Sequence, residues 1–429
     1  MNEYFDPRPK AERALLIGIE LDTVRKDEAL SLLRELGGLA RSLGLEVADS
    51  ISVKLREKTA SLLVGTGKAD EIVAIAKAEN VDSIVFDHAL SPSQQRNWET
   101  LSGKKVYDRS ELIIKIFSSR ALTKEASLQV ELARLEFSLP RLAHSYEDLS
   151  RQRGGRYGTK GSGEQKIELD RRSIEHRIHE IKEEMKDVRK SRDVQRRRRE
   201  RVELPRAAIV GYTNAGKSSL LNALTAADVL AEDKLFATLD PTTRKLNFKS
   251  GGNLLMTDTV GFVRNLPHNL IDAFKATLEE ASASDLLIHV ADASDPEVEI
   301  HMATTEKVLS EIGAGELPRI LVLNKVDIAD QAVLDQWLRI HPESLAVSAK
   351  TGRGLDSLAL LIEKTLTSDM EEVVLAIPHS DYSLIPLIHR EGVVIEEKTE
   401  DERSIVRCRI PRRLEGKVGK YRQIDEEKQ

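Results

Sequence analysis

A glycine-rich stretch in the middle of the chain has the residue types of a phosphate-binding loop. Residues 211–218 lie between an apolar run that predicts a strand (207–210) and one that predicts a helix (219–224). Glycines let backbone N–H groups approach phosphate oxygens, and the helix N-terminus adds positive potential. We expect Lys217 to reach the β- and γ-phosphates and the Ser218 hydroxyl to ligate Mg²⁺. The expected nucleotide contacts are Gly211, Tyr212, Thr213, Asn214, Ala215, Gly216, Lys217 and Ser218.

A second motif has the residues to bind the metal and the terminal phosphate. Residues 258–261 follow the apolar run 254–257, which predicts another strand. A carboxylate at a strand end can hold Mg²⁺ through water, and the N–H of Gly261 can contact a γ-phosphate. We expect nucleotide contacts at Asp258, Thr259, Val260 and Gly261.

Two later motifs select the base. Asp327 can accept hydrogen bonds from N1–H and the 2-amino group of guanine, which adenine does not offer, and such a site strongly rejects the wrong ligand. A backbone N–H in residues 348–350 can reach guanine O6. Each of the four motifs lies at the carboxyl end of a predicted strand, and parallel sheets bind ligands at this edge. We therefore predict a GTP site. The base contacts are expected at Asn324, Lys325, Val326, Asp327, Ser348, Ala349 and Lys350.

The segment between the first two motifs is where a switch loop would cover the γ-phosphate. One threonine there should complete the Mg²⁺ shell, and we favour Thr238, with Thr242 and Thr243 as alternatives. Ordering of such a loop turns hydrolysis into a signal. The expected contacts are Phe236, Ala237, Thr238, Leu239 and Asp240.

Position 262 bears on the rate of the reaction. Many GTPases place a glutamine there to orient the attacking water, but this chain has Phe262. We expect slow intrinsic hydrolysis, with Lys217, Thr238 and Gly261 as the catalytic set. Asn214 resembles the asparagine with which cation-activated GTPases hold K⁺; an ordinary loop residue is the alternative.

Strands and helices alternate around these motifs, which predicts an α/β fold. We expect a GTP-binding domain with a mainly parallel sheet at residues 204–370. Its strand candidates are 207–210, 254–257, 286–290, 320–323 and 345–347.

Two further domains are predicted on either side. Residues 1–120 should form an α/β domain with strands at 14–19, 61–65 and 81–86 and helices at 27–43 and around Ile72. We read Gly65-Thr66-Gly67-Lys68 as a strand-to-helix turn, because Ala69 lacks the hydroxyl that a metal would need. Residues 371–429 should form a small α+β domain with strands at 373–377, 393–397 and 405–410 and a helix near Leu384.

Between the N-terminal domain and the GTP-binding domain, residues 121–203 predict an antiparallel helical hairpin. Apolar residues recur at spacings of 4, 3, 4 and 3 on each side, as in the seam of two packed helices. Pro140 should kink or stop the first helix. The seam residues are Leu128, Leu132, Leu135, Leu139 and Leu142, and then Ile174, Ile178, Ile181, Met185 and Val188.

The hairpin is basic although the chain is acidic. Residues 151–201 carry 18 Lys/Arg against 10 Asp/Glu, in a chain of net charge -6. This asymmetry favours contact with a polyanion such as nucleic acid; a solvated helix or a flexible charged linker is the alternative. Cationic side chains at the tip can pair phosphates, and a tyrosine can stack on a base. The predicted RNA-binding residues are Arg151, Arg153, Arg156, Tyr157 and Lys160.

The length and composition of the chain limit the number of domains and the class of protein. A chain of 429 residues suggests two to four domains. One cysteine, Cys408, excludes an internal disulfide and a thiolate metal cluster. No run approaches the length of a membrane span and the start lacks a secretory pattern, so we expect a cytoplasmic protein. We expect a monomer.

These residues resemble the HflX family of ribosome-associated GTPases. The resemblance rests on residues 236–244 and 258–262 and on the glycine-rich loop before Asp170. Residues 90–92 and 128–133 are similar to the family's N-terminal signatures, so the similarity extends over about residues 14–370.

The resemblance implies binding to the large ribosomal subunit and its RNA, with the hairpin loop in the peptidyl-transferase region. It also implies ribosome-stimulated hydrolysis and the separation of stalled ribosomes into subunits. Ser162 stands where the family has a proline, which leaves the docking of the tip open. A large-subunit assembly factor, and an RNA-docking module with GTP as a conformational ligand, are alternatives. A second nucleotide site in residues 1–115 also stays open.

Overall fold

The chain divides into two compact units. The first comprises residues 1–188, 233–239 and 264–274, and the second comprises residues 189–232, 240–263 and 275–429. Two short segments from the predicted GTP-binding region therefore belong to the first unit. The computed structural model describes residues 11–21, 26–55, 57–145, 162–200, 204–225, 235–249, 252–265, 280–367, 370–400 and 402–423.

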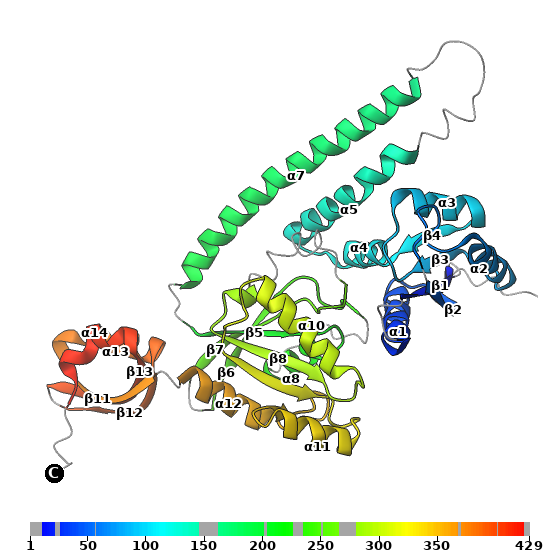
Figure 1. Cartoon of the computed structure of the whole chain (residues 1–429). Helices are drawn as coiled ribbons and strands as arrows, with labels where there is room; N and C mark the ends of the chain where they lie inside the picture. The colour runs from blue at the N-terminus through cyan, green and yellow to red at the C-terminus, as the bar shows by residue number, and fades with distance from the viewer. Residues whose placement is uncertain are drawn as a thin grey trace, which may run out of the picture. The chain divides into compact units, whose positions relative to one another are not determined.

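The first unit begins with a parallel four-stranded sheet in the order β2-β1-β3-β4 (Figure 1). One face is buried under α2 and α3, where Trp98 is fully buried and donates its indole N–H to the Leu62 carbonyl at 2.8 Å. Helix α1 packs on β1 and β2 and also contacts α4. The elements are β1 (Arg13–Leu21), α1 (Lys26–Ser42), β2 (Glu46–Leu55), α2 (Thr66–Ala78), β3 (Ser83–Phe86), α3 (Pro92–Ser102), β4 (Lys105–Asp108) and α4 (Arg109–Arg120).

One strand prediction in this domain is wrong. Residues 61–65 form turns, because Leu63 has a left-handed φ of 67°, which a regular strand does not tolerate. Gly65 then caps the N-terminus of α2, whose first turn contains Thr66, Gly67 and Lys68, so residues 65–68 begin a helix and are not a strand-to-helix turn. The strand is instead β2 (Glu46–Leu55), whose mixed polar and apolar residues gave a weak signal because it lies at a sheet edge.

Helices α5 (Lys124–Ser145) and α7 (Ser162–Glu200) form the predicted hairpin. Helix α5 continues past Pro140 to Ser145, so it does not stop at the proline. Of the described helices, none is apolar enough over a sufficient length to cross a membrane, and the 39-residue α7 is strongly polar. The predicted seam is confirmed in a core of Leu128, Leu132, Ile181 and Met185, flanked by Leu135, Ile178 and Val188, while Leu139, Leu142 and Ile174 do not belong to this core.

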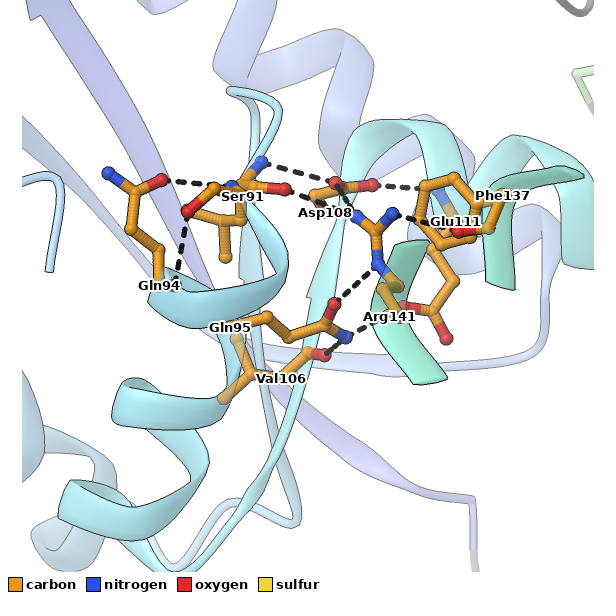
Figure 2. Close-up of polar contacts among 9 residues, drawn as sticks. Ser91, Gln94, Gln95, Val106, Asp108, Glu111, Phe137 and Arg141 are labelled. Atoms are coloured by element: carbon orange, nitrogen blue, oxygen red, sulfur yellow. Dashed lines mark hydrogen bonds and ion pairs between the residues drawn. The ribbon is translucent and has the colours of Figure 1, made fainter. Parts of the chain in front are cut away.

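A half-buried arginine, Arg141, joins α5 to the sheet (Figure 2). Arg141 donates from Nη2 to the Asp108 carboxylate at 3.2 Å and to the Leu90 carbonyl at 3.1 Å. Its Nε donates to Gln95 Oε1 at 2.9 Å, and the guanidinium lies 3.4 Å from the centre of the Phe137 ring. Burial raises the pKa of Asp108, while the Arg141 cation lowers it. The pair therefore fixes α5 at the carboxyl end of β4.

The second unit contains a six-stranded sheet in the order β10-β9-β8-β5-β7-β6, parallel except for β6. Helices α8 and α12 cover one face, and α10 and α11 cover the other. The antiparallel strand β6 was not predicted. The elements are β5 (Arg206–Gly211), α8 (Lys217–Thr225), β6 (Thr242–Asn247), β7 (Asn253–Asp258), β8 (Leu286–Asp292), α10 (Val298–Glu311), β9 (Arg319–Asn324), α11 (Gln331–Ile340), β10 (Leu345–Ala346) and α12 (Leu355–Thr367).

The C-terminal residues form a small antiparallel sheet in the order β11-β13-β12, with α13 and α14 packed on one side (Figure 1). Leu375, Ile388 and Cys408 are fully buried between the sheet and these helices. The three predicted strands and the helix near Leu384 are confirmed. The elements are β11 (Met370–Pro378), α13 (Leu384–Glu391), β12 (Val393–Thr399), β13 (Arg403–Pro411) and α14 (Arg412–Val418).

His289 on β8 is an ionisable group inside the six-stranded sheet. It is 2% exposed. Burial, together with smaller effects of Arg319, Lys217 and His341, lowers the pKa of His289 to about 4. Between pH 6.5 and pH 4, the unfolded chain binds a proton at His289 while the folded protein keeps this side chain neutral. The free energy of unfolding therefore decreases as the pH falls through this range.

We predict that His289→Leu removes this acid sensitivity. From pH 7.5 to pH 5, protonation of His289 in the unfolded chain should lower the unfolding free energy of the wild type by about 2 kcal/mol. The variant should lack this contribution to the acid-induced loss. Urea unfolding followed by Trp337 fluorescence, in a Trp98→Phe background, measures it. His176→Gln, at an exposed site on α7, is the control. Equal acid losses in wild type and His289→Leu would contradict the prediction.

Candidate functional site

The phosphate loop connects β5 to α8 and depends on two glycines. A Cβ on Gly211, where φ is 150°, would lie 2.2 Å from the Val290 carbonyl oxygen. A Cβ on Gly216, where φ is 91°, would lie 2.3 Å from Asn324 Nδ2. Both positions thus exclude any side chain. Asn214 is also left-handed, with φ 62°, a conformation that asparagine tolerates better than most residues.

Lys217 opens α8 with its side chain folded into the loop. Its ammonium donates to the carbonyls of Gly211 at 3.2 Å and Tyr212 at 2.8 Å. The side chain is 6% exposed. Burial lowers the pKa of Lys217 to about 8, while Asp258 raises it. A nucleotide phosphate would replace the neutral carbonyls with anionic oxygens, which are stronger acceptors for an ammonium.

Ser218 and Asp258 meet at the mouth of the loop. The Ser218 hydroxyl donates to Asp258 Oδ2 at 2.6 Å. Asp258 ends β7 and is fully buried. A hydroxyl and a carboxylate are the hard oxygen ligands that Mg²⁺ prefers, so the pair fits the metal that GTPases generally use.

The Asp-Thr-Val-Gly motif is joined to the phosphate loop by backbone hydrogen bonds. Thr213 N–H donates to the Phe262 carbonyl at 2.8 Å, and Phe262 N–H donates to the Gly211 carbonyl at 3.2 Å. A Cβ on Gly261 would lie 2.7 Å from Thr213 Cγ2 and 2.9 Å from Lys217 Nζ. Gly261 therefore lies directly against Lys217, and only glycine fits there. Phe262 is 2% exposed and has no polar side-chain atom with which to orient water.

Asn324 joins the phosphate loop to the last motif. Its Nδ2 donates to the Ala215 carbonyl at 2.9 Å, and its Oδ1 accepts from Ala349 N–H at 3.0 Å. Asp327 accepts from the Ser348 hydroxyl at 2.7 Å, and this hydrogen bond lowers the pKa of Asp327. The carboxylate is thus anionic and oriented, as guanine recognition requires.

Two residues of this region, Asp292 and His301, were missed by sequence reasoning. Asp292 pairs with Lys325 at 2.7 Å; its place at the end of β8 was the only signal. The imidazole of His301 on α10 stacks on Tyr212, with ring centres 3.8 Å apart and planes 12° apart. The Thr243 hydroxyl bonds that of Thr257 at 2.9 Å, which holds this alternative switch threonine on β6.

The structure brings most of the predicted nucleotide site together at the carboxyl ends of β5, β7, β9 and β10, within the second unit. Residues 236–239 instead belong to the first unit. There Phe236, 2% exposed and with φ 57°, packs edge-on against Phe117 at a ring distance of 4.5 Å. Nucleotide contact by residues 236–240, and Thr238 as a metal ligand, stay predictions. Arg151, Arg153, Arg156, Tyr157 and Lys160 lie outside the described residues.

Comparisons with known proteins show the family of this chain. Three family models match: "GTP-binding GTPase N-terminal" at residues 31–118, "GTP-binding GTPase Middle Region" at 120–199 and "50S ribosome-binding GTPase" at 206–325. The GTPase HflX of Akkermansia muciniphila is 44% identical over 423 residues, covering 96% of this chain and 97% of that protein. The GTPase HflX of Escherichia coli K12 is 38% identical over 410 residues, covering 95% of each.

The chain belongs to the HflX family of GTPases. It is an α/β protein that binds guanine nucleotides and hydrolyses GTP, as the family resemblance implied. Among solved structures, this HflX-family chain is similar to a GTP-binding protein from Sulfolobus solfataricus in complex with GDP. That similarity has 25% identity and a TM-score of 0.45, and it covers 83% of this chain and 99% of that one.

We predict that Asp327→Asn weakens GDP binding by about 10- to 100-fold, because charge-assisted hydrogen bonds to guanine are lost. The amide can instead donate to the O2 of xanthine, so affinity for xanthosine diphosphate should rise. Titration with fluorescent nucleotides measures both constants. Asp335→Asn, an exposed change on α11, is the control. Unchanged GDP affinity would remove Asp327 from the base site.

Proposed function

We propose that this HflX-family GTPase binds the large ribosomal subunit in the cytoplasm and uses GTP binding and hydrolysis to split or rescue stalled ribosomes. The observation that supports this most is a buried Phe262 at the water-orienting position of the GTP-binding domain. Such a site needs a group from a partner for fast hydrolysis. The match of residues 206–325 to the model described as "50S ribosome-binding GTPase" supports the ribosome as that partner.

We assign the hydrolysis step to residues around the phosphate loop. Water attacks the γ-phosphate, and Lys217 and the N–H of Gly261 stabilise the charge that develops there. Ser218, Asp258 through water, and Thr238 would hold Mg²⁺, which neutralises phosphate charge when bound. We further propose K⁺ as an accessory ion at Asn214, whose left-handed conformation within the loop is compatible with that role.

We assign ribosome contact to the hairpin. A division into residues 1–120, 121–203, 204–370 and 371–429 places it between the first and the GTP-binding domains, and the three matched family models support the first two boundaries. Arg151, Arg153, Arg156 and Lys160 would pair RNA phosphates, and Tyr157 would stack on an exposed base.

We predict that large ribosomal subunits raise the GTP hydrolysis rate of the purified protein by about tenfold or more, because they supply the group that Phe262 cannot. Phosphate release at saturating GTP, with and without large subunits, measures the effect. Small subunits at the same concentration are the control. Absence of stimulation by either subunit would refute the ribosome as the activating partner.

A second prediction concerns the hairpin tip. Changing Arg151, Arg153 and Arg156 to Gln should weaken large-subunit binding and lower its salt dependence, because about three phosphate contacts are lost. Nucleotide affinity should stay the same. Co-sedimentation across a salt series provides the measurement.

The matched control removes three positive charges elsewhere on the hairpin. Arg171, Arg172 and Lys186 on α7 are exposed and paired with glutamates of the same helix. Changing these three to Gln should have the smaller effect on large-subunit binding. Equal losses in the two triple variants would mean that net charge, and not the tip, governs attachment.

A further inference from the structure

The lysine of the base motif is paired with an aspartate at the end of the neighbouring strand. Lys325 Nζ lies 2.7 Å from Asp292 Oδ2, and the two side chains are 25% and 17% exposed. Lys325 follows β9 and Asp292 ends β8, and these parallel strands are neighbours within the second unit. An ion pair that is partly shielded from water is stronger than one on an open surface. Among the described residues, no other carboxylate pairs with this ammonium.

The Asp292 carboxylate is oriented by the turn that follows β8. Its Oδ1 accepts from the N–H of Ser294 at 3.0 Å and from the Ser294 hydroxyl at 2.6 Å. An aspartate that bonds the backbone two residues further on is a common means of fixing a turn. Ala293 N–H donates to the Asn324 carbonyl at 2.9 Å, which joins this turn to the end of β9. One carboxylate oxygen therefore binds the turn, and the other faces Lys325.

The backbone at Lys325 has a conformation that lysine rarely adopts. Its φ is 63°, in the left-handed region. Such a conformation persists only where surrounding contacts impose it, and it occurs most often at functional sites. The Lys325 carbonyl accepts from the N–H groups of Ile328 at 3.1 Å and Ala329 at 3.2 Å. These bonds fix the main chain, but they do not direct the long side chain, which is placed by Asp292.

The next carboxylate along the chain is Asp327, which we predict to recognise guanine. Two residues span at most about 7 Å, and a lysine side chain is long and flexible. The hydrogen bond from Ser348 lowers the pKa of Asp327 most, and the positive charge of Lys325 lowers it further. Without Asp292, the Lys325 ammonium would therefore pair with Asp327. It would then occupy the oxygens that the N1–H and 2-amino group of guanine require.

We propose that Asp292 is a positioning residue for guanine-nucleotide binding. It holds the Lys325 ammonium at the end of β8, so that the Asp327 carboxylate stays available to the base. A site that is arranged before its ligand arrives binds with a smaller ordering cost. The inference rests on Asp327 as the base acceptor, which the Asp327→Asn titration tests separately, and not on the proposed ribosomal role.

The test measures the Kd for GDP of the full chain by titration with a fluorescent GDP. Asp292→Asn keeps an oxygen for the Ser294 bonds but replaces the acceptor of Lys325 with an amide NH₂ group. We expect GDP affinity to fall by about three- to tenfold. In a Lys325→Met background the same change should have no further effect, because the charge through which Asp292 acts is absent.

Two other variants separate this role from general effects of charge and folding. Asp356 pairs with Lys249 at 3.0 Å in the same unit, so Asp356→Asn also removes a negative charge from a lysine. It should leave GDP affinity unchanged. Ser294→Ala removes one of the two bonds that orient the Asp292 carboxylate, and it should weaken GDP binding less than Asp292→Asn does. It serves as the test if Asp292→Asn does not fold.

Three outcomes would overturn the inference. Unchanged or tighter GDP binding in Asp292→Asn, or in Ser294→Ala where the former is unfolded, would show that Asp292 does not keep Lys325 away from the base site. An equal loss in Asp356→Asn would show that net charge governs the affinity. A full loss from Asp292→Asn in the Lys325→Met background would show that Asp292 does not act through the lysine.

Discussion

The arrangement of the nucleotide site depends on two hydrogen bonds made by the carboxamide of Asn324. One side of it binds the phosphate loop at Ala215 and the other binds the backbone at Ala349. A single buried side chain, 2% exposed, thus sets the distance between the phosphate and base motifs. Such a bond works only because parallel strands bring their carboxyl ends to one edge of the sheet.

The nucleotide site was predictable because each of its motifs is short and follows an apolar strand. The spacing within residues 211–218 and 324–327 carries the chemistry without knowledge of the fold. The hairpin seam was predictable for a similar reason, since a 4-3 repeat of apolar residues has one simple packing solution. Strand β2 and the antiparallel β6 were missed, because edge strands mix polar and apolar residues.

Contacts between distant parts of the chain left no such signal. Arg264 and Glu35 form an ion pair although they are 229 residues apart, and no periodic pattern links them. Phe236 was expected to contact the nucleotide, yet its side chain is buried against Phe117 in the first unit. Its left-handed φ could not be inferred from the residue type, since phenylalanine rarely adopts it. Tertiary context decided both positions.

The first unit is built from segments that lie far apart in the sequence, and this has a consequence for its folding during synthesis. Arg109 and its acceptor on Arg264 are 155 residues apart. At about 5–20 residues per second, translation of that interval takes roughly 8–30 s. During that time Glu35 on α1 and Arg109 on α4 lack Arg264 as a partner, and Phe117 lacks its ring contact with Phe236. A fragment that ends before residue 233 would keep those surfaces uncovered permanently, so the N-terminal domain expressed alone is a poor substitute for the same residues in the whole chain.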